Sequence, residues 1–419
     1  MALNPIGAPS VAIDLVVDRI AELLFDSAIL VGDRATWLTP QLAGDGPAAP
    51  GEDEAAPTIG RTGVSCLYDG SAGIGWALAV VGATRGDRRL QEVAVAGVRH
   101  ALSRAELEGR NGLYDGAAGV GLAAIAVGGL LGVAELETGG VGLLRRAGTS
   151  TPMSDDLIDG SAGIALACLR GARLTGDGVL LTAAQRQVEL VVARAERHPW
   201  GWCWPSQGAA GLCGLAHGTA GVAWAVGEVA AATATSPSLS AARDAARRYE
   251  RSWFDPRSNT WPDLRQEVAA ADGSPPRPNL WCHGGVGIGL SRLALYRVDP
   301  HPALAGEAVA ARTAASQEAA DQVAAGVLPS GLTVCHGLGG TLALLVATAD
   351  RLEAPEDLHA ARQLLAGALD HLGTDPAVWP GGLLHEPSPG LMTGLAGTML
   401  VLAGMEDPAA LAPLIGLGA

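Results

Sequence analysis

The sequence predicts an all-α protein in which seven inner helices are surrounded by about seven outer helices, an (α/α) toroid. Three observations predict this fold. A glycine-containing motif occurs seven times, an almost uncharged run follows it, and amphipathic stretches of helical periodicity separate the copies. A helix that is apolar all round must be buried on every side, whereas an amphipathic helix buries one face. The uncharged helices are therefore expected inside and the amphipathic helices outside.

The motif has Asp, His or Thr at its first place and Gly at its second and fifth places. Its copies begin at Asp69, Asp115, Asp159, His217, His283, His336 and Thr393. Successive copies lie 46, 44, 58, 66, 53 and 57 residues apart, which suits a helical hairpin with two loops. The glycines allow a tight turn and a close backbone approach where a helix begins. Each repeat is therefore expected to contribute one inner and one outer helix.

The predicted elements follow the chain in a regular order. An amphipathic helix is expected at 11–30, before the first motif. Inner helices are expected directly after the motifs, as at 117–130, 219–232 and 338–348. Outer helices are expected at 89–107, 182–197, 239–253, 303–325 and 358–372.

One stretch interrupts this order near the start of the chain. Residues 44–60 are rich in Ala, Pro, Gly and acid, a composition that buries too little apolar surface to order itself. We expect a mobile loop at 40–62 within a single domain of residues 1–419.

Composition and charge exclude several classes of protein. The formal net charge of −15 argues against a nucleic-acid partner. A content of 48% hydrophobic residues with 58 Gly is compatible with closely packed helices or with a membrane protein. The uncharged stretch 116–133 contains six Gly, and most other segments are shorter than the ~20 apolar residues that a span needs. We therefore expect no transmembrane segment.

The cysteines and the N-terminus indicate a reducing compartment. Six Cys in 419 residues are too few and too scattered for a disulfide framework. The N-terminus has no basic region, and Asp14 and Asp18 interrupt its first apolar run, so we expect no signal peptide and a cytoplasmic protein. Four cysteines are expected to be ordinary core or surface thiols, namely Cys66, Cys168, Cys203 and Cys213. The Trp-rich segment 200–205 is expected to pack against the rim of the ring, with a peptide groove as the alternative.

Acidic residues recur in the first three repeats. Asp69, Asp115 and Asp159 occupy the same motif position, and we expect them to cap the N-termini of the inner helices. Asp156 has no equivalent, since the first two repeats have Cys66 and Gly112 at its position. Asp156 is therefore a candidate functional residue, with a solvated loop acid as the alternative.

Histidine replaces the shared Asp in the next three repeats, and Cys282 and Cys335 precede two of those histidines. Two Cys with one or two His from adjacent hairpins can build a tetrahedral zinc site. On spacing alone, two small buried thiols are an equal alternative. With Cys282, Cys335 and His336 as ligands, one zinc position stays open, as in catalytic sites. A substrate thiol bound there would lose its proton, and His217 is placed for proton transfer.

These motifs resemble those of the LanC-like lanthionine synthetase cyclases. The resemblance runs from the LYDGSAG segment at 67–73, through Trp281-Cys282-His283-Gly284 and Cys335-His336-Gly337, to the last repeat. It implies a double α-toroid with one zinc ion held by Cys282, Cys335 and His336.

The resemblance also implies a reaction. It is the Michael-type addition of a precursor-peptide Cys thiolate to dehydroalanine or dehydrobutyrine, which forms (methyl)lanthionine thioether rings. His217 and Asp156 match the acid/base groups of the family. His283 stands where relatives often have Tyr; its ring is expected to face the same pocket, and it is kept as a third catalytic candidate. Arg277 is the loosest candidate, for an Arg that relatives have shortly before the first zinc Cys.

The chain contains no kinase or dehydratase region, so a free-standing cyclase is expected. Its substrate would be a dehydrated precursor peptide with its leader, and its candidate partners are a separate dehydratase and a transporter at the inner face of the membrane. One alternative is a LanC-like protein that adds glutathione to dehydroamino acids. Another is a noncatalytic, zinc-containing peptide-binding scaffold. A glycosidase or terpenoid-type toroid is disfavoured because the shared Asp set is confined to three repeats and only two Phe are present.

Overall fold

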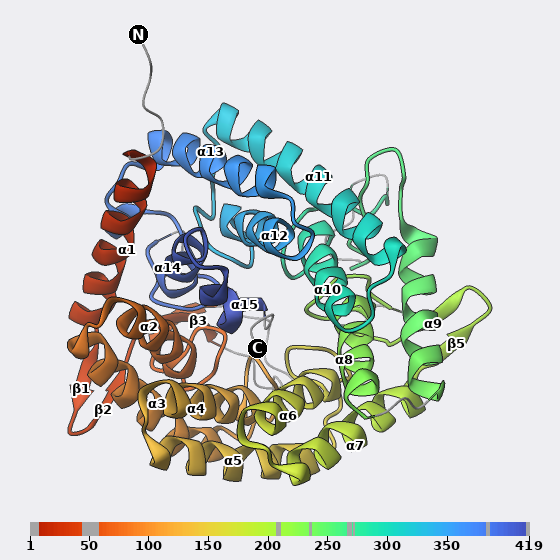
Figure 1. Cartoon of the computed structure of the whole chain (residues 1–419), viewed down its shortest axis with the longest axis horizontal. Coiled ribbons are helices and arrows are strands. Elements are labelled where there is room, and N and C mark those ends of the chain that lie inside the picture. The colour runs from red at the N-terminus through yellow and green to blue at the C-terminus, as the bar shows by residue number, and fades with distance from the viewer. Residues whose placement is uncertain are drawn as a thin grey trace.

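The computed structural model describes residues 8–43, 58–206, 211–233, 237–265, 270, 273–382 and 386–415, and its helices form two concentric rings (Figure 1). The inner ring consists of α2 (Ser71–Arg85), α4 (Ala117–Leu131), α6 (Ser161–Thr175), α8 (Thr219–Ala232), α10 (Gly285–Val298), α12 (Leu338–Arg351) and α14 (Leu395–Gly404). Each inner helix contacts the next, and α14 contacts α2. The ring is therefore closed, and the predicted toroid is confirmed.

An outer helix covers each inner helix. The outer ring consists of α1 (Ala8–Asp26), α3 (Arg88–Glu108), α5 (Ala134–Thr149), α7 (Gly178–Arg194), α9 (Pro237–Trp253), α11 (Pro302–Ala325) and α13 (Pro355–Leu372). The outer helices after α1 each pack on the inner helix of their own repeat; they are α3, α5, α7, α9, α11 and α13. The outer helix α1 packs instead on α14, the last inner helix. The first outer helix and the last inner helix thus meet where the ring closes.

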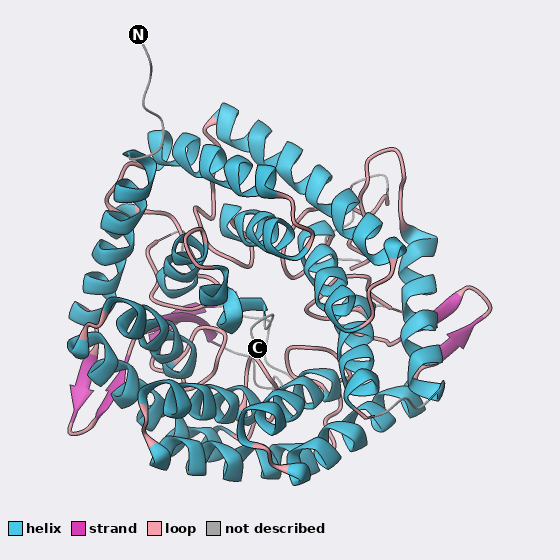
Figure 2. Cartoon of the chain, viewed as in Figure 1, coloured by secondary structure: helices cyan, strands magenta, loops and turns pink. Residues whose placement is uncertain are grey.

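Short elements complete the described chain. The strands are β1 (Ile29–Val31), β2 (Arg34–Thr36), β3 (Thr39–Ala43), β4 (Thr58–Thr62), β5 (Glu196–His198) and β6 (Gly201–Cys203). They pair as three antiparallel ribbons, of which β1–β2 and β5–β6 lie at the outer edge (Figure 2). The C-terminal part contributes η2 (Pro376–Val378), η3 (Pro408–Leu411) and α15 (Ala412–Ile415).

The structure differs from the predicted elements in several places. The outer helix predicted at 182–197 ends at Arg194, because Glu196–His198 forms strand β5. The first helix ends at Asp26 rather than at residue 30, because Ile29–Val31 pairs with Arg34–Thr36 around Gly32, whose φ is 61°. Strands occupy both ends of the expected loop at 40–62, where Thr39–Ala43 pairs with Thr58–Thr62, and residues 44–57 lie outside the described part. No residue range was predicted for α5, the outer helix of the second repeat.

The glycines of α5 explain why it was missed. Glycine weakens a helix by about 1 kcal/mol relative to alanine, so Gly139, Gly140 and Gly142 disguise the helical pattern. Gly140 has a packing reason: a Cβ at this position would lie 2.6 Å from the carbonyl oxygen of Gly121 on α4. Glycine therefore lets α5 approach α4 closely within a 44-residue repeat.

A closed belt of backbone hydrogen bonds joins the seven motif loops. The amide of each loop donates to a carbonyl of the next loop at 2.8–3.2 Å. The donor–acceptor pairs are Tyr68–Tyr114, Tyr114–Ile158, Leu157–Ala216, Ala216–Cys282, Trp281–Cys335, Cys335–Met392 and Met392–Tyr68. The belt gathers the residues just before each inner helix into one rim of the toroid.

The fifth-place glycine of the motif lets each inner helix sit directly on its own loop. A Cβ at Gly119 would lie 1.7 Å from the carbonyl oxygen of Leu113, and a Cβ at Gly397 would lie 1.8 Å from that of Leu391. Neither distance can be tolerated without moving the backbone. The glycine at the fifth place of the motif is therefore required for the geometry of the belt.

The shared aspartates do not cap the inner helices, so that prediction was wrong. The N-cap residues are Gly70, Gly116 and Gly160, and none makes a side-chain cap hydrogen bond. Each Asp comes one position too early to cap its helix. The Asp69 carboxylate instead reaches the neighbouring repeat, where it accepts hydrogen bonds from Thr393 N at 3.1 Å and Thr393 Oγ1 at 2.6 Å.

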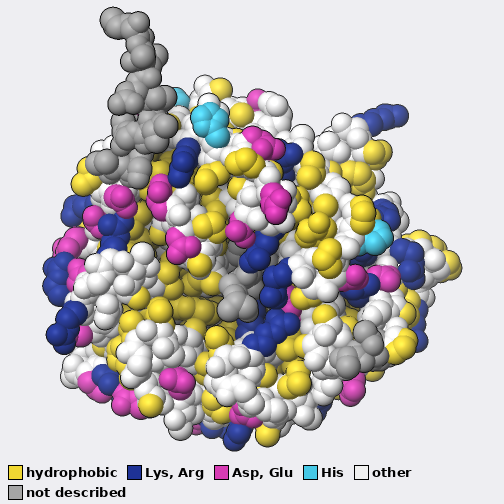
Figure 3. Space-filling view, in the orientation of Figure 1, with side chains coloured by type: hydrophobic (Ala, Val, Ile, Leu, Met, Phe, Trp, Pro, Cys, Tyr) yellow, Lys and Arg dark blue, Asp and Glu magenta, His cyan; other side chains and the backbone are white. Residues whose placement is uncertain are grey.

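Within the described residues, no helix is long and apolar enough to cross a membrane. The uncharged inner helices are instead shielded by the outer ring. In Figure 3, hydrophobic side chains line the hollow at the centre of the visible face.

Candidate metal centre and active site

The predicted metal ligands Cys282, Cys335 and His336 are brought together. Their ligand atoms all lie within 4.8 Å of one another, and Cys335 Sγ is 3.6 Å from His336 Nε2. Both thiols are buried, while His336 is exposed. Because Cys282 and Cys335 are themselves members of the hydrogen-bonded belt, the backbone fixes the spacing between two adjacent repeats. This set of two sulfurs and one imidazole fits a zinc ion with one position for a further ligand.

Tyr68, from the first repeat, completes this cluster and was not anticipated as a site residue. Its hydroxyl donates a hydrogen bond to Cys335 Sγ at 2.9 Å. Its ring meets Tyr114 edge-on at 6.2 Å, and Tyr114 meets Trp281 in the same way at 5.1 Å. Tyr precedes Asp in both of the first two repeats, so the repeat pattern gave no reason to single out Tyr68.

The two thiols differ in acidity. A hydrogen bond from the Cys335 thiol, followed by one from His336, holds the pKa of Cys282 well below its ordinary value. Burial and the neighbouring Cys282 raise the pKa of Cys335. Of the two thiols, Cys282 is therefore the one that loses its proton more readily. A bound cation would deprotonate both thiols.

His217 and Asp156, the predicted acid/base residues, form a direct pair. His217 Nδ1 lies 2.7 Å from Asp156 Oδ2. The other oxygen of this buried carboxylate accepts the amide N–H groups of Ile158 and Asp159 at 3.0 and 3.1 Å. With Nδ1 engaged, Nε2 is the ring nitrogen left for proton exchange with a substrate.

Burial and pairing act in opposite directions on this dyad. Burial lowers the pKa of His217, but the hydrogen bond and the charge of Asp156 outweigh it, so the net pKa is raised. Burial raises the pKa of Asp156, but the hydrogen bond and charge of His217 outweigh it, and the net pKa is lowered. The pair therefore favours an imidazolium beside a carboxylate.

His283 lies on the other side of His217. The two rings are stacked, with centroids 5.9 Å apart and planes at 26°. His283 is buried, and its Nδ1 lies 3.9 Å from Asp263 Oδ1. Burial lowers the pKa of His283, so a neutral ring is favoured. Its catalytic role stays a prediction.

The arginine near the site is Arg265 rather than Arg277. Arg277 Nη1 donates to the carbonyl oxygens of Trp253 and Thr260, at 3.4 and 3.0 Å, and so fastens a loop. Arg265 pairs with Asp263, with Nη2 and Oδ2 2.6 Å apart. Its positive charge adds to the effect of burial in lowering the pKa of His283, whereas the hydrogen bond with Cys282 keeps the net pKa of His336 raised. Asp263 and Arg265 lie in the connection between α9 and α10, outside the repeated motif. The spacing of the motif therefore could not identify them.

Two further carboxylates face the dyad. Burial raises the pKa values of Asp115 and Asp159 to about 6. The charge of Asp156 adds to both shifts. This rim of the site is therefore acidic, and part of its charge is lost in mildly acidic solution.

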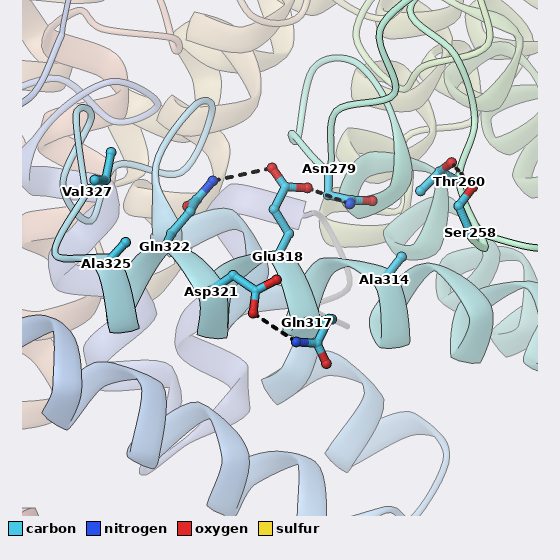
Figure 4. A pocket seen from close by; sticks show the side chains of 10 residues that line it. All are labelled: Ser258, Thr260, Asn279, Ala314, Gln317, Glu318, Asp321, Gln322, Ala325 and Val327. Atoms are coloured by element: carbon cyan, nitrogen blue, oxygen red, sulfur yellow. Dashed lines mark hydrogen bonds between the residues drawn. The ribbon is translucent and has the colours of Figure 1, made fainter.

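The loop that carries Cys282 is also fixed from the outside. Asn279 Nδ2 donates to Glu318 Oε2 on α11 at 2.6 Å, and Gln322 Nε2 donates to the other oxygen at 3.3 Å (Figure 4). These side chains line a pocket of about 500 Å³. A Cβ at Gly285 would lie 2.2 Å from Asn279 Oδ1, so the start of α10 packs tightly on this anchor.

Comparisons with known proteins agree with this fold. The family model described as "Lanthionine synthetase C-like protein" matches residues 64–414. The solved structure of nisin cyclase is similar, with a TM-score of 0.59 and 17% identity over 85% of this chain and 92% of that chain. The Lin0763 protein from Listeria innocua has a TM-score of 0.50 and 10% identity over 94% and 97% of the two chains. These likenesses show the fold. No curated protein matches the sequence significantly.

Proposed function

Because the chain belongs to the lanthionine synthetase C-like family, we propose that it is a zinc-dependent lanthipeptide cyclase. It would add Cys thiolates of a precursor peptide to dehydroalanine or dehydrobutyrine and form (methyl)lanthionine rings. One observation supports this function above all. Three zinc-type donors and an Asp–His proton-transfer pair are arranged at one rim of the ring, where the charge of Cys282 also acts on His217.

Cys282, Cys335 and His336 would hold the zinc ion, and Tyr68 would support Cys335 through its hydrogen bond. The metal, when bound, supplies a positive charge that makes a coordinated substrate thiol acidic. A second layer of hydrogen bonds keeps metal ligands in position. In this chain, the backbone amides of the belt and the hydroxyl of Tyr68 would supply these hydrogen bonds.

The reaction balances without an oxidant or a leaving group. The substrate thiol first gives up its proton to solvent. Its sulfur then forms a bond to the β-carbon of the dehydro residue, and the electron pair of the C=C bond moves toward the carbonyl as an enolate. A proton then adds to the α-carbon. Asp156 orients His217 through Nδ1, and the raised pKa of His217 makes Nε2 a suitable donor of that proton.

The substrate would be a dehydrated precursor peptide with its leader, supplied by a separate dehydratase. A transporter at the inner face of the membrane is a further candidate partner. Free thiols at all six cysteines suit a reducing, cytoplasmic setting.

The test is to incubate zinc-loaded protein with a dehydrated precursor and to count its free thiols over time. His217→Ala should keep zinc and lower the rate by about 10²–10⁴-fold, the usual contribution of a general acid or base. His359→Ala, on the exposed surface of α13, is the matched control. A scaffold would consume no thiols, and consumption only of added glutathione would indicate the alternative thiol substrate.

A further inference from the structure

A second group of metal-donor side chains lies on the β5–β6 hairpin, outside the outer ring and beside α9 (Figure 1). The register pairs Glu196 with Cys203 and His198 with Gly201. Side chains directly opposite each other share a face of an antiparallel pair, and alternate residues along a strand do so as well. Glu196, His198 and Cys203 therefore project from one face of the hairpin.

Their donor atoms have the spacing of a metal site. One ligand atom from each side chain lies within 4.8 Å of the other two, and His198 Nε2 is 3.9 Å from Glu196 Oε2. Among the described residues, the same measure is met by one other group, the cluster of Cys282, Cys335 and His336. We propose that Glu196, His198 and Cys203 form a second site for a zinc-type divalent cation, independent of the proposed cyclase activity.

The chemistry of the three donors supports a borderline-soft metal. Zinc accepts Cys sulfur, His nitrogen and carboxylate oxygen, usually four ligands in all, so three protein donors leave one position for water. A hard cation such as Mg²⁺ favours oxygen ligands instead. The mixed set therefore selects the zinc class.

The surroundings hold two of the donors in place. The His198 ring stacks on Trp200 with centroids 5.0 Å apart and planes at 7°, which restricts its orientation. Cys203 is buried and packs with Tyr249 of α9 in a small hydrophobic cluster. Burial, and next the charge of Glu196, raise the pKa of Cys203; a bound cation would reverse both effects by stabilising the thiolate.

Occupancy would join strand β5 to strand β6 within the connection between α7 and α8. Glu196 and His198 are partly exposed, with 47% and 35% of their side-chain surface accessible, whereas Cys203 is anchored in the protein. A metal bound only by the folded state stabilises it by mass action. Metal binding at this site would therefore stabilise the folded β5–β6 hairpin.

The test measures metal bound per chain after zinc loading and dialysis. The wild-type chain should bind two zinc ions, and Cys203→Ser and His198→Ala should each bind one. Cys168→Ser and His359→Ala are matched controls that should keep two, because Cys168 is a buried thiol whose described contact is the carbonyl oxygen of Leu144. One zinc ion in the wild type, or two in His198→Ala, would overturn the proposal.

A second measurement uses His198→Ala, so its result does not depend on whether Cys203→Ser folds. Cobalt substitution gives a thiolate charge-transfer absorption, which should weaken but persist in His198→Ala because Cys282 and Cys335 are unchanged. His198→Ala should also retain the cyclase activity of the wild type. An unchanged absorption would contradict the second site, whereas loss of thiol consumption in both proteins would contradict only the proposed function.

Discussion

Asp156 determines which nitrogen of His217 is available for chemistry. Its Oδ2 engages Nδ1, while two backbone amides hold its Oδ1. The carboxylate therefore sets both the ring orientation and its charge. We therefore propose that Asp156 acts through His217, as a positioning residue.

Asp156→Asn should move the high-pH limb of the cyclase rate toward lower pH. The carboxylate raises the pKa of His217 against the opposing effect of burial, so the imidazolium survives to higher pH in the wild type. A step that needs the imidazolium is lost as pH rises through this pKa. Without the carboxylate, burial dominates and the loss comes earlier.

Rate profiles from pH 5 to pH 9, with zinc content measured at each pH, test this effect. Asp155→Asn is the matched control, because Asp155 pairs with Arg194 at 3.1 Å instead. A profile of unchanged shape, lowered equally at all pH values, would show that Asp156 has only a structural role.

Tyr68→Phe should weaken metal binding by about 10-fold, within the range found when an outer hydrogen bond to a metal site is removed. The hydroxyl donates to Cys335 Sγ at 2.9 Å, so its loss makes this sulfur more electron-rich. The thiolate-to-cobalt absorption should move to lower energy. Competition with a chromophoric chelator measures the affinity.

The matched control is Tyr296→Phe, near the end of α10 that lies far from the loop carrying Cys282. If Tyr68→Phe kept both the affinity and the absorption of the wild type, the hydroxyl would have no influence on the metal. Tyr68 also shows what the sequence could not predict. Cys282, Cys335 and His336 break the repeat and so attract attention, whereas Tyr68 obeys it and lies 267 residues from its partner.

At the scale of helices, a buried ion network fixes the start of α8, the helix that follows His217. Arg292 of α10 pairs with Glu250 of α9 and, at 2.6 Å, with Glu307 of α11. Thr219 Oγ1 of α8 donates to Glu250 Oε1 at 3.0 Å. The side chains of Arg292 and Glu250 are 1% and 0% exposed. With no water to solvate them, the two buried charges stabilise each other.

Glu250→Leu should reduce the free energy of unfolding by at most about 3–5 kcal/mol, the cost of breaking a buried ion pair, because Arg292 keeps Glu307 as a carboxylate partner. The double variant Glu250→Leu/Arg292→Met should recover part of this loss, because it removes both charges. Equilibrium denaturation in urea measures the difference. Glu406→Gln breaks the exposed pair with Arg362 and should cost less than about 1 kcal/mol.

The order of the helices was largely predictable, and the exceptions have local causes. The inner helices were recognised because motif glycines precede apolar runs, and most outer helices because of their amphipathic periodicity. Helix α5 was missed because its glycines, needed for contact with α4, remove the apolar pattern. The end of α1 was misplaced because Ile29 fits a helical stripe as well as it fits a strand.

At the scale of the whole molecule, the ring is closed by contacts between the first and last repeats. Met392 N donates to Tyr68 O in the belt, Asp69 accepts two hydrogen bonds from Thr393, and α1 covers α14. An open array of repeats unfolds according to nearest-neighbour interactions and frays at its ends. A closed ring has no free end, so its first and last repeats should unfold together.

Thr393→Val tests this closure. The change removes the hydroxyl that donates to Asp69 Oδ2 at 2.6 Å, and an unsatisfied buried acceptor costs about 1–3 kcal/mol. Hydrogen exchange should accelerate in both α2 and α14, although only α14 follows the substituted loop. Thr84→Val, which removes an exposed bond to Val80 O within α2, should leave both helices unchanged. Faster exchange in α14 alone would mean that the last repeat frays independently and that the Asp69–Thr393 contact does not hold the ring closed.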